Sequence, residues 1–305
     1  MMEALSQFWA SYSNLINLCL LNAFIAYGVF LALSANMFTL GTGGFMSLGA
    51  YTSVLLTMGS DAPFVVALVA GGLVSACAAL LIGAPVLRLR GDYFMLATFA
   101  FTEVVRVLAL NLESVTGGAI GIMNIPTKTE TWHYIALLVV LIVLIRLFRR
   151  SHFGLAVAAI KSDDVVPQAV GIDVFRYRLS IFTVSGFIAG LAGGFAAHMN
   201  YFIAPGDFGL ARSIDALAFP ILGGVNALLG PILGAVFTTT LPEVLRFSSQ
   251  LREILMGALI IGVVLYLPGG MYSLLSFSPS ALGKIGRKAA AKGLAAPNPA
   301  HGDGA

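Results

Sequence analysis

Two charged residues of opposite sign stand three positions apart in an apolar stretch of this sequence. Glu103 and Arg106 both fall between Tyr93 and Leu110, and this spacing puts them on one face of a helix, where they can form an ion pair. Ionisable groups inside an apolar span usually face a bundle interior or a wet cavity. The pair therefore predicts either a point on a translocation path or a structural salt bridge.

Other arrangements that carry out chemistry are missing from the sequence. There is no HExxH, no Cys/His cluster and no G-x-x-x-x-G-K-[ST] phosphate loop, and the GKIGRK of the tail lacks that spacing. We therefore expect no enzyme activity, no metal and no cofactor. Any nucleotide hydrolysis that powers this chain must come from another chain.

A few other polar residues are interpreted without assigning them a function. Asp207, Arg212 and Asp215 form a cluster that we interpret as solvated loop charges at an outer mouth. His198 has no second ligand at a useful spacing, so we predict a hydrogen-bonded interface residue rather than a metal or proton site.

The composition explains why so few charges are present. Of the 305 residues, 58% are hydrophobic and 10% are charged, against about 25% charged in an ordinary globular domain. No Asp, Glu, Lys or Arg occurs between Glu3 and Asp61, and a bilayer is crossed by about 20 apolar residues. The predicted fold class is all-α, a polytopic helical transmembrane protein in contact with membrane lipid. A net charge of +3 gives no indication of a nucleic-acid partner.

Apolar runs, and the charged, Gly and Pro residues that separate them, place the expected membrane segments. Simple spans are predicted over Leu15–Ser34, Phe45–Met58, Phe64–Val86, Tyr93–Leu110, His133–Phe148, Leu179–Met199 and Ile254–Leu267. The stretch Ser213–Leu241 is too long for one simple span and contains several Pro and Gly residues. We favour two short or re-entrant helices that meet near Gly223–Asn226, a kind of break that is tolerated where it faces protein or water. About eight to nine segments result.

Basic residues set the expected orientation. Arg88 and Arg90 flank one loop and a larger basic group marks the segment 149–178, so both should be cytoplasmic under the positive-inside rule. The N-terminus is then outside and the C-terminus cytoplasmic. We expect a permease domain over 1–277 and a basic, disordered tail over 278–305, whose Lys and Arg residues can attract anionic lipid.

The segment 149–178 is polar and about 30 residues long. It contains short amphipathic patterns; Asp163 and Asp164 can cap a helix start, and Gly171 can end a helix. These features predict one or two short surface helices that dock into a partner's groove. A solvated or interfacial loop is the alternative.

Three stretches carry a resemblance to a known family. They are RLRGDYFMLATFAFTEVVRVLALNLESVTGGAIGI (Arg88 to Ile122), FGLAVAAIKSDDVVPQAVGIDVFRYRLSIF and FIAGLAGGFAAH. Together they resemble the permease subunit of branched-chain amino-acid ABC transporters of the Liv type, and the similarity reaches to about residue 275.

The resemblance implies a function and a set of partners. The chain would be one half of the membrane path of a bacterial or archaeal importer in the plasma (inner) membrane. Its partners would be ATP-binding cassette subunits, a second permease subunit that is a copy or a related chain, and an external substrate-binding protein. A urea or short-chain amide importer, an ion-coupled secondary transporter using Glu103 and Arg106, and a structural membrane scaffold are the alternatives.

The resemblance also assigns roles within the segment 149–178. The segment looks like an EAA-type coupling helix, in which Gln168, Ala169 and Gly171 match a Glu-Ala-x-Gly core, with Gln168 in place of the common Glu. The candidate ATPase-coupling residues are Gly154, Asp163, Asp164, Gln168, Ala169 and Gly171.

Overall fold

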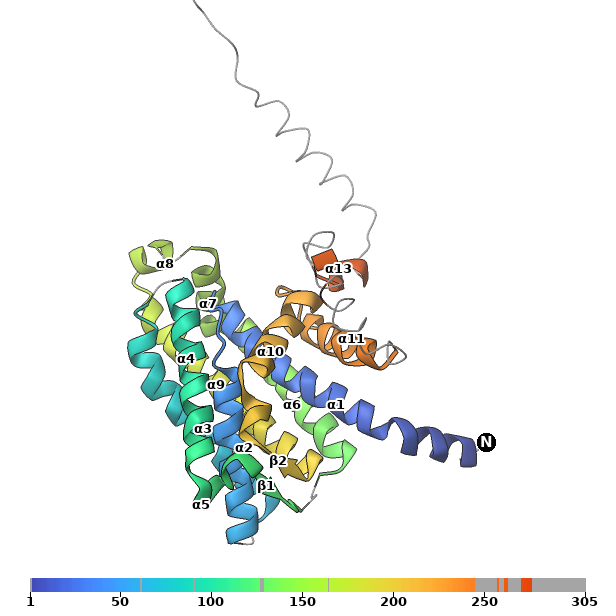
Figure 1. The fold of residues 1–305 in the computed structure, drawn as a ribbon. Helices are drawn as coiled ribbons and strands as arrows, with labels where there is room; N and C mark the ends of the chain where they lie inside the picture. Colours follow the sequence, from blue (N-terminus) through green and yellow to red (C-terminus); the bar gives the residue numbers. More distant parts are fainter. Residues whose placement is uncertain are drawn as a thin grey trace, which may run out of the picture.

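A computed structural model of the chain describes residues 2–60, 62–89, 91–126, 129–163, 165–244, 257, 261–262 and 270–275 (Figure 1). These residues are almost entirely helical, which confirms the all-α class. The longer helices are α1 (Met2–Ser34), α2 (Thr42–Gly59), α3 (Phe64–Val86), α4 (Asp92–Asn111), α6 (Thr131–Arg150), α7 (His152–Ser162), α9 (Val174–Asn200), α10 (Leu210–Gly223) and α11 (Gly230–Val244). The shorter elements are α5 (Glu113–Thr116), α8 (Val165–Ala169), α13 (Tyr272–Leu275), the 3-10 turns η1 (Gly118–Ile120) and η2 (Pro205–Phe208), and the strands β1 (Ile122–Met123) and β2 (Phe202–Ile203).

Five of the described helices are long and apolar enough to cross a membrane. They are α3, α4, α6, α9 and residues Tyr12–Ser34 of α1. With α2, α10 and α11 they make eight helices, which is compatible with the expected eight to nine segments. The expected span Ile254–Leu267 lies outside the described residues, as do Arg90, Asp164 and the tail 278–305.

The faces of the outer helices are apolar and exposed, as a bilayer or a second subunit requires. Valine and leucine side chains on α3, α4 and α6 are about half exposed, although water would disfavour such a surface. Examples are Val65, Leu73, Leu96, Val104, Val139 and Val143. Polytopic membrane embedding therefore explains both the sequence and the surface.

Small residues let α2, α3 and α9 pack at close range. A Cβ atom added to Gly49 of α2 would collide with the carbonyl oxygen of Gly190 in α9, and one added to Gly71 of α3 would lie 2.5 Å from the oxygen of Gly49. Close backbone contact of this kind is how membrane helices associate without a hydrophobic driving force. Helices α2 and α9 lie at the centre of the molecule with α3 packed against both, and α1 packs on α9.

The connection between α1 and α2 is a break inside the protein. The Leu40 N–H donates to Thr98 Oγ1 at 3.0 Å, and Thr102 Oγ1 donates to the Leu40 carbonyl at 2.8 Å. These threonines lie about 9 and 15 Å along α4, counted from Asp92. The chain therefore unwinds beside the middle of α4, where side chains replace the hydrogen bonds that water would supply.

The helices α10 and α11 form an antiparallel hairpin, which confirms the predicted division of Ser213–Leu241 into two helices. Helix α10 ends at Gly223 and α11 begins at Gly230, and added Cβ atoms at Gly223 and Gly234 would meet backbone of the opposite helix. The hairpin rests on α1. In Figure 1 α11 lies on the side of α1 away from α3 and α4, whereas α10 also contacts α2 and α4.

The close approach of α2 to α9 predicts the effect of one added methyl group. Gly49→Ala should lower the free energy of unfolding by about 1–3 kcal/mol, because neither backbone can move away freely. Thermal unfolding of the detergent-solubilised protein measures the effect. Gly59→Ala on the same helix is the control, since a Cβ there meets nothing within 4 Å. Equal melting temperatures for the two variants would contradict the described packing.

Candidate functional site

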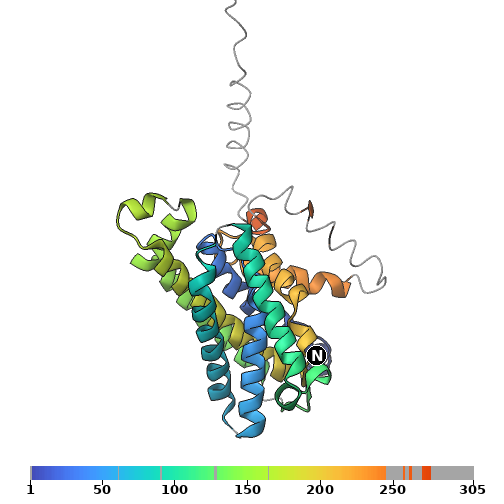
Figure 2. The ribbon, with the colours of Figure 1, turned by 60° about the vertical axis from the view of Figure 1, so that its left-hand side comes forward.

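The segment 149–178 folds into two short helices at one end of the molecule. In both views α8 projects beyond the long helices, whereas α7 lies against their ends (Figures 1 and 2). Ser151 caps α7, since its Oγ accepts from the Gly154 N–H at 3.2 Å. One face of α7 is buried through Val157 and Ile160, so α7 is anchored on the bundle while α8 extends from it.

The boundaries of α8 confirm two predictions made from residue types. Asp163 Oδ1 accepts from the Val165 N–H at 2.7 Å, which caps the start of α8. Gly171 has φ +85°, a left-handed conformation that ends the helix and that other residues rarely adopt. Asp164, the second predicted cap, lies outside the described residues.

The short helix α8 presents an apolar surface away from the bundle. Val165, Val166 and Val170 are 73%, 63% and 74% exposed, and Gln168 and Ala169 between them are exposed as well. Exposed apolar patches with polar surroundings mark interaction sites. The arrangement can therefore dock into a groove of another protein, as the amphipathic pattern predicted.

A second contact ties α7 to the α10–α11 hairpin. The Lys161 ammonium donates to Asn226 Oδ1 at 2.8 Å and to the Val225 carbonyl at 3.4 Å, and Arg149 Nη2 donates to the Asn226 carbonyl at 3.3 Å. Burial lowers the pKa of Lys161, and the neighbouring Arg149 charge lowers it further. The acceptors of the hairpin turn therefore stabilise a cation that its surroundings disfavour.

Glu103 and Arg106 form the predicted ion pair on α4. Arg106 Nε lies 2.7 Å from Glu103 Oε2, and the two side chains are 35% and 28% exposed, Arg106 first. An added Cβ at Gly209, just before α10, would lie 3.4 Å from Arg106 Cδ. The pair is thus mutually neutralised and lies beside the start of α10.

The interpretation of Arg212 as a solvated loop charge is wrong. Arg212 lies on α10, is half-buried, and donates from Nη2 to Asn22 Oδ1 of α1 at 2.8 Å. Asn22 in turn donates to Thr239 Oγ1 of α11 at 2.9 Å. Sequence reasoning missed this network because its members lie up to 217 positions apart; the one signal was Asn22, a polar residue inside an apolar span. Asp207 and Asp215 are exposed, as expected.

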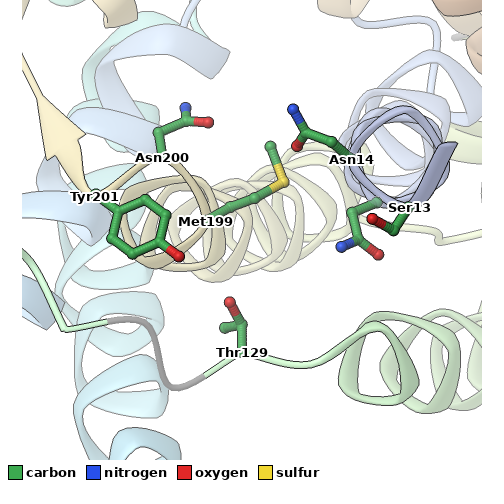
Figure 3. Close-up of a pocket in the computed structure, with 7 residues that line it drawn as sticks. Ser13, Asn14, Thr129, Met199, Asn200 and Tyr201 are labelled. Atoms are coloured by element: carbon green, nitrogen blue, oxygen red, sulfur yellow. The ribbon is translucent and has the colours of Figure 1, made fainter. Parts of the chain in front are cut away.

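A polar cavity lies at the opposite end of α9 from α7 and α8. It measures about 480 Å³ and is lined by hydroxyl and amide side chains (Figure 3). The lining residues are Ser13, Asn14, Asn17, Thr129, Met199, Asn200 and Tyr201. Next to it, His198 is fully buried, with Nδ1 2.9 Å from the Pro126 carbonyl and Nε2 3.3 Å from Ser53 Oγ. That contact confirms His198 as a hydrogen-bonded interface residue.

Long apolar helices, a hairpin of two short helices and buried polar groups define a polytopic helical membrane protein. Residues 11–264 match the family described as the branched-chain amino acid transport system permease component, and the chain belongs to that family.

Two relatives are high-affinity branched-chain amino acid transport system permease proteins named LivM. The one from Salmonella typhimurium is 32% identical over 271 residues, and the one from Escherichia coli is 31% identical over 271 residues. Each alignment covers 78% of this chain and 64% of the relative. A shorter match, 30% over 128 residues and 39% of this chain, is to an autoinducer 2 import system permease protein of Klebsiella pneumoniae, of which it covers 37%. The chain thus spans less than two thirds of the LivM relatives.

The contact of Lys161 with the hairpin turn predicts a local change in dynamics. Lys161→Met should raise amide hydrogen exchange in residues 224–229 by about threefold to tenfold, because a lost hydrogen bond costs roughly 0.5–1.5 kcal/mol. Exchange monitored by mass spectrometry measures this. Arg150→Met removes an exposed cation from the end of α6, next to Arg149. It should leave the exchange of residues 224–229 unchanged. If both variants behave alike, the contact does not hold the turn.

Proposed function

We propose that the chain is one half of the transmembrane path of an ATP-driven importer for branched-chain, hydrophobic amino acids. The family and the names of the LivM relatives support the class of solute. The second half of the path would be a copy of this chain or a related one. An external binding protein would deliver the solute, and ATP-binding cassette subunits would supply energy.

The observation that carries the coupling proposal is the surface of α8. Its exposed valines, with Gln168 and Ala169 among them, form a docking patch on a helix capped by Asp163 and ended by Gly171. A cleft of an ATPase subunit would hold this patch, and Asp164 is proposed as a further coupling residue from the sequence alone. Gly154, at the start of α7, would belong to the same coupling segment.

A physical route leads from that patch into the membrane. ATP binding would move α8 together with α7, and the bonds from Lys161 and Arg149 would pass the movement to the α10–α11 turn. The hairpin would then tilt against α1 and switch the path between inward-facing and outward-facing states, as in alternating access.

The orientation follows from the same proposal. Docking of ATPase subunits puts α7 and α8 on the cytoplasmic side of a prokaryotic plasma membrane, with the N-terminus outside and the C-terminus inside. Residues 1–277 would form the permease domain and 278–305 a basic cytoplasmic tail. The polar cavity of Figure 3 would then open toward the outside.

Reconstitution tests the proposal directly. We expect liposomes that contain this chain, its partner permease, the ATPase subunits and the binding protein to accumulate labelled leucine when ATP is supplied. Uptake should stop when the phosphate-loop lysine of the ATPase is replaced, since that residue contacts the nucleotide phosphates. Preferred uptake of urea would point to the amide importer, and uptake that follows an ion gradient without ATP would contradict the proposal.

The docking patch gives a second test. The double variant Val166→Asp and Val170→Asp should lose most ATPase subunit on co-purification, because two charges would be desolvated in an apolar groove at several kcal/mol. Val115→Asp, at an exposed valine of α5 at the opposite end of the molecule, is the control. Retention of the ATPase by the double variant would exclude α8 as the docking element.

A further inference from the structure

The guanidinium of Arg212 is held deep in the bundle by neutral groups. Asn22, its hydrogen-bond acceptor, precedes Ser34 at the end of α1 by twelve residues, or about 18 Å of helix. Asn22 therefore lies well inside α1, away from both of its ends. Asn22 is itself 5% exposed and is held by Thr239. The network orients the guanidinium through neutral hydrogen-bonding groups.

No carboxylate in the described part of the chain forms a salt bridge with Arg212. The ion pairs between described residues join Glu103 with Arg106 and Asp173 with Arg176. Asp215, one turn further along α10, and Asp207 act on the guanidinium electrostatically without forming a salt bridge. A half-buried cation and an exposed carboxylate therefore stand near each other, each with hydrogen-bonding capacity that the other does not use.

This arrangement matches the head of a free α-amino acid. The solute carries a carboxylate and an ammonium group on neighbouring atoms, and both lose water when it enters a membrane path. A guanidinium binds a carboxylate through two parallel N–H donors, and a carboxylate accepts from an ammonium. By contrast, Glu103 and Arg106 are already paired at 2.7 Å, so a solute would have to break their salt bridge.

The helices around Arg212 are those that would move in the proposed transport cycle. It lies on the discontinuous hairpin whose turn is bonded to Lys161 of α7, while its acceptor lies on α1. A shift of α10 against α1 would change the distance from Arg212 to Asn22 and so change how strongly the guanidinium can bind another acceptor. A site of this kind can be weak in one state and stronger in another.

We propose that Arg212 and Asp215 form a transient binding site for the zwitterionic head of an amino acid inside the permease. Arg212, positioned by Asn22 and Thr239, binds the carboxylate, and Asp215 binds the ammonium group. The inference rests on the proposed function and adds to it the point of contact with the solute.

Transport with separate readouts of uptake and hydrolysis tests this site. In the reconstituted complex, Arg212→Gln and Asp215→Asn should each lower leucine uptake by about tenfold or more, the effect of losing a charged hydrogen bond. ATP hydrolysis stimulated by the binding protein should continue, so that leucine moved per ATP falls. Ile214→Val, exposed on the same turn, should transport normally. Unchanged leucine per ATP in both charge variants would overturn the inference.

Chemical labelling provides a test that survives a loss of transport. In a chain with Cys19→Ser and Cys77→Ser, the added thiol of Asp215→Cys should react with a methanethiosulfonate reagent, and millimolar leucine should slow the reaction. Leucinamide, which has no carboxylate, should not slow it. Equal protection by both compounds would overturn the role of Arg212. If the unmodified complex fails to take up leucine with ATP, the proposed function itself is wrong and this inference falls with it.

Discussion

A bilayer offers no water to backbone groups, and this constraint governs every irregular part of the structure. Where the chain leaves a helix inside the membrane, side chains must supply the missing partners. Thr98 and Thr102 do so for Leu40, and the break between α1 and α2 can therefore lie beside the middle of α4. Such breaks place non-helical backbone at a depth where uninterrupted helices would present only side chains. That is where a membrane transporter can bind a polar solute.

The same constraint links the two ends of the proposed mechanism. The α10–α11 turn exposes carbonyl groups that need donors, and the cations of Lys161 and Arg149 provide them. One set of hydrogen bonds thus completes the hairpin and attaches it to the segment that carries α8. Glycine contacts hold α2 and α9 tightly together, so the proposed mechanism assigns the movement to the hairpin and α1 rather than to the centre of the bundle.

The charged residues inside the bundle differ in the partners that they contact. Glu103 and Arg106 neutralise each other, which favours the structural member of the two interpretations that their spacing allowed. Arg212 has a neutral hydrogen-bond partner, Asn22, and forms no salt bridge within the described residues. An ionisable group that is costly to bury and has no salt-bridge partner is a functional candidate. The structure therefore shifts attention from α4 to α10 for contact with the solute.

The sequence by itself determined the class of fold, most membrane segments, the division of Ser213–Leu241 and the ends of α8. These features depend on local hydrophobicity, on Pro and Gly, and on capping residues, all of which act over a few positions. Only the tertiary structure decided what α10 contacts: Asn22 and Thr239 meet Arg212 from distant parts of the chain. The α1–α2 break was hidden for the same reason, because Leu40 is satisfied by α4 rather than by its neighbours. Spacing along one helix revealed the pair on α4, whereas partners brought together by packing leave no periodic signal.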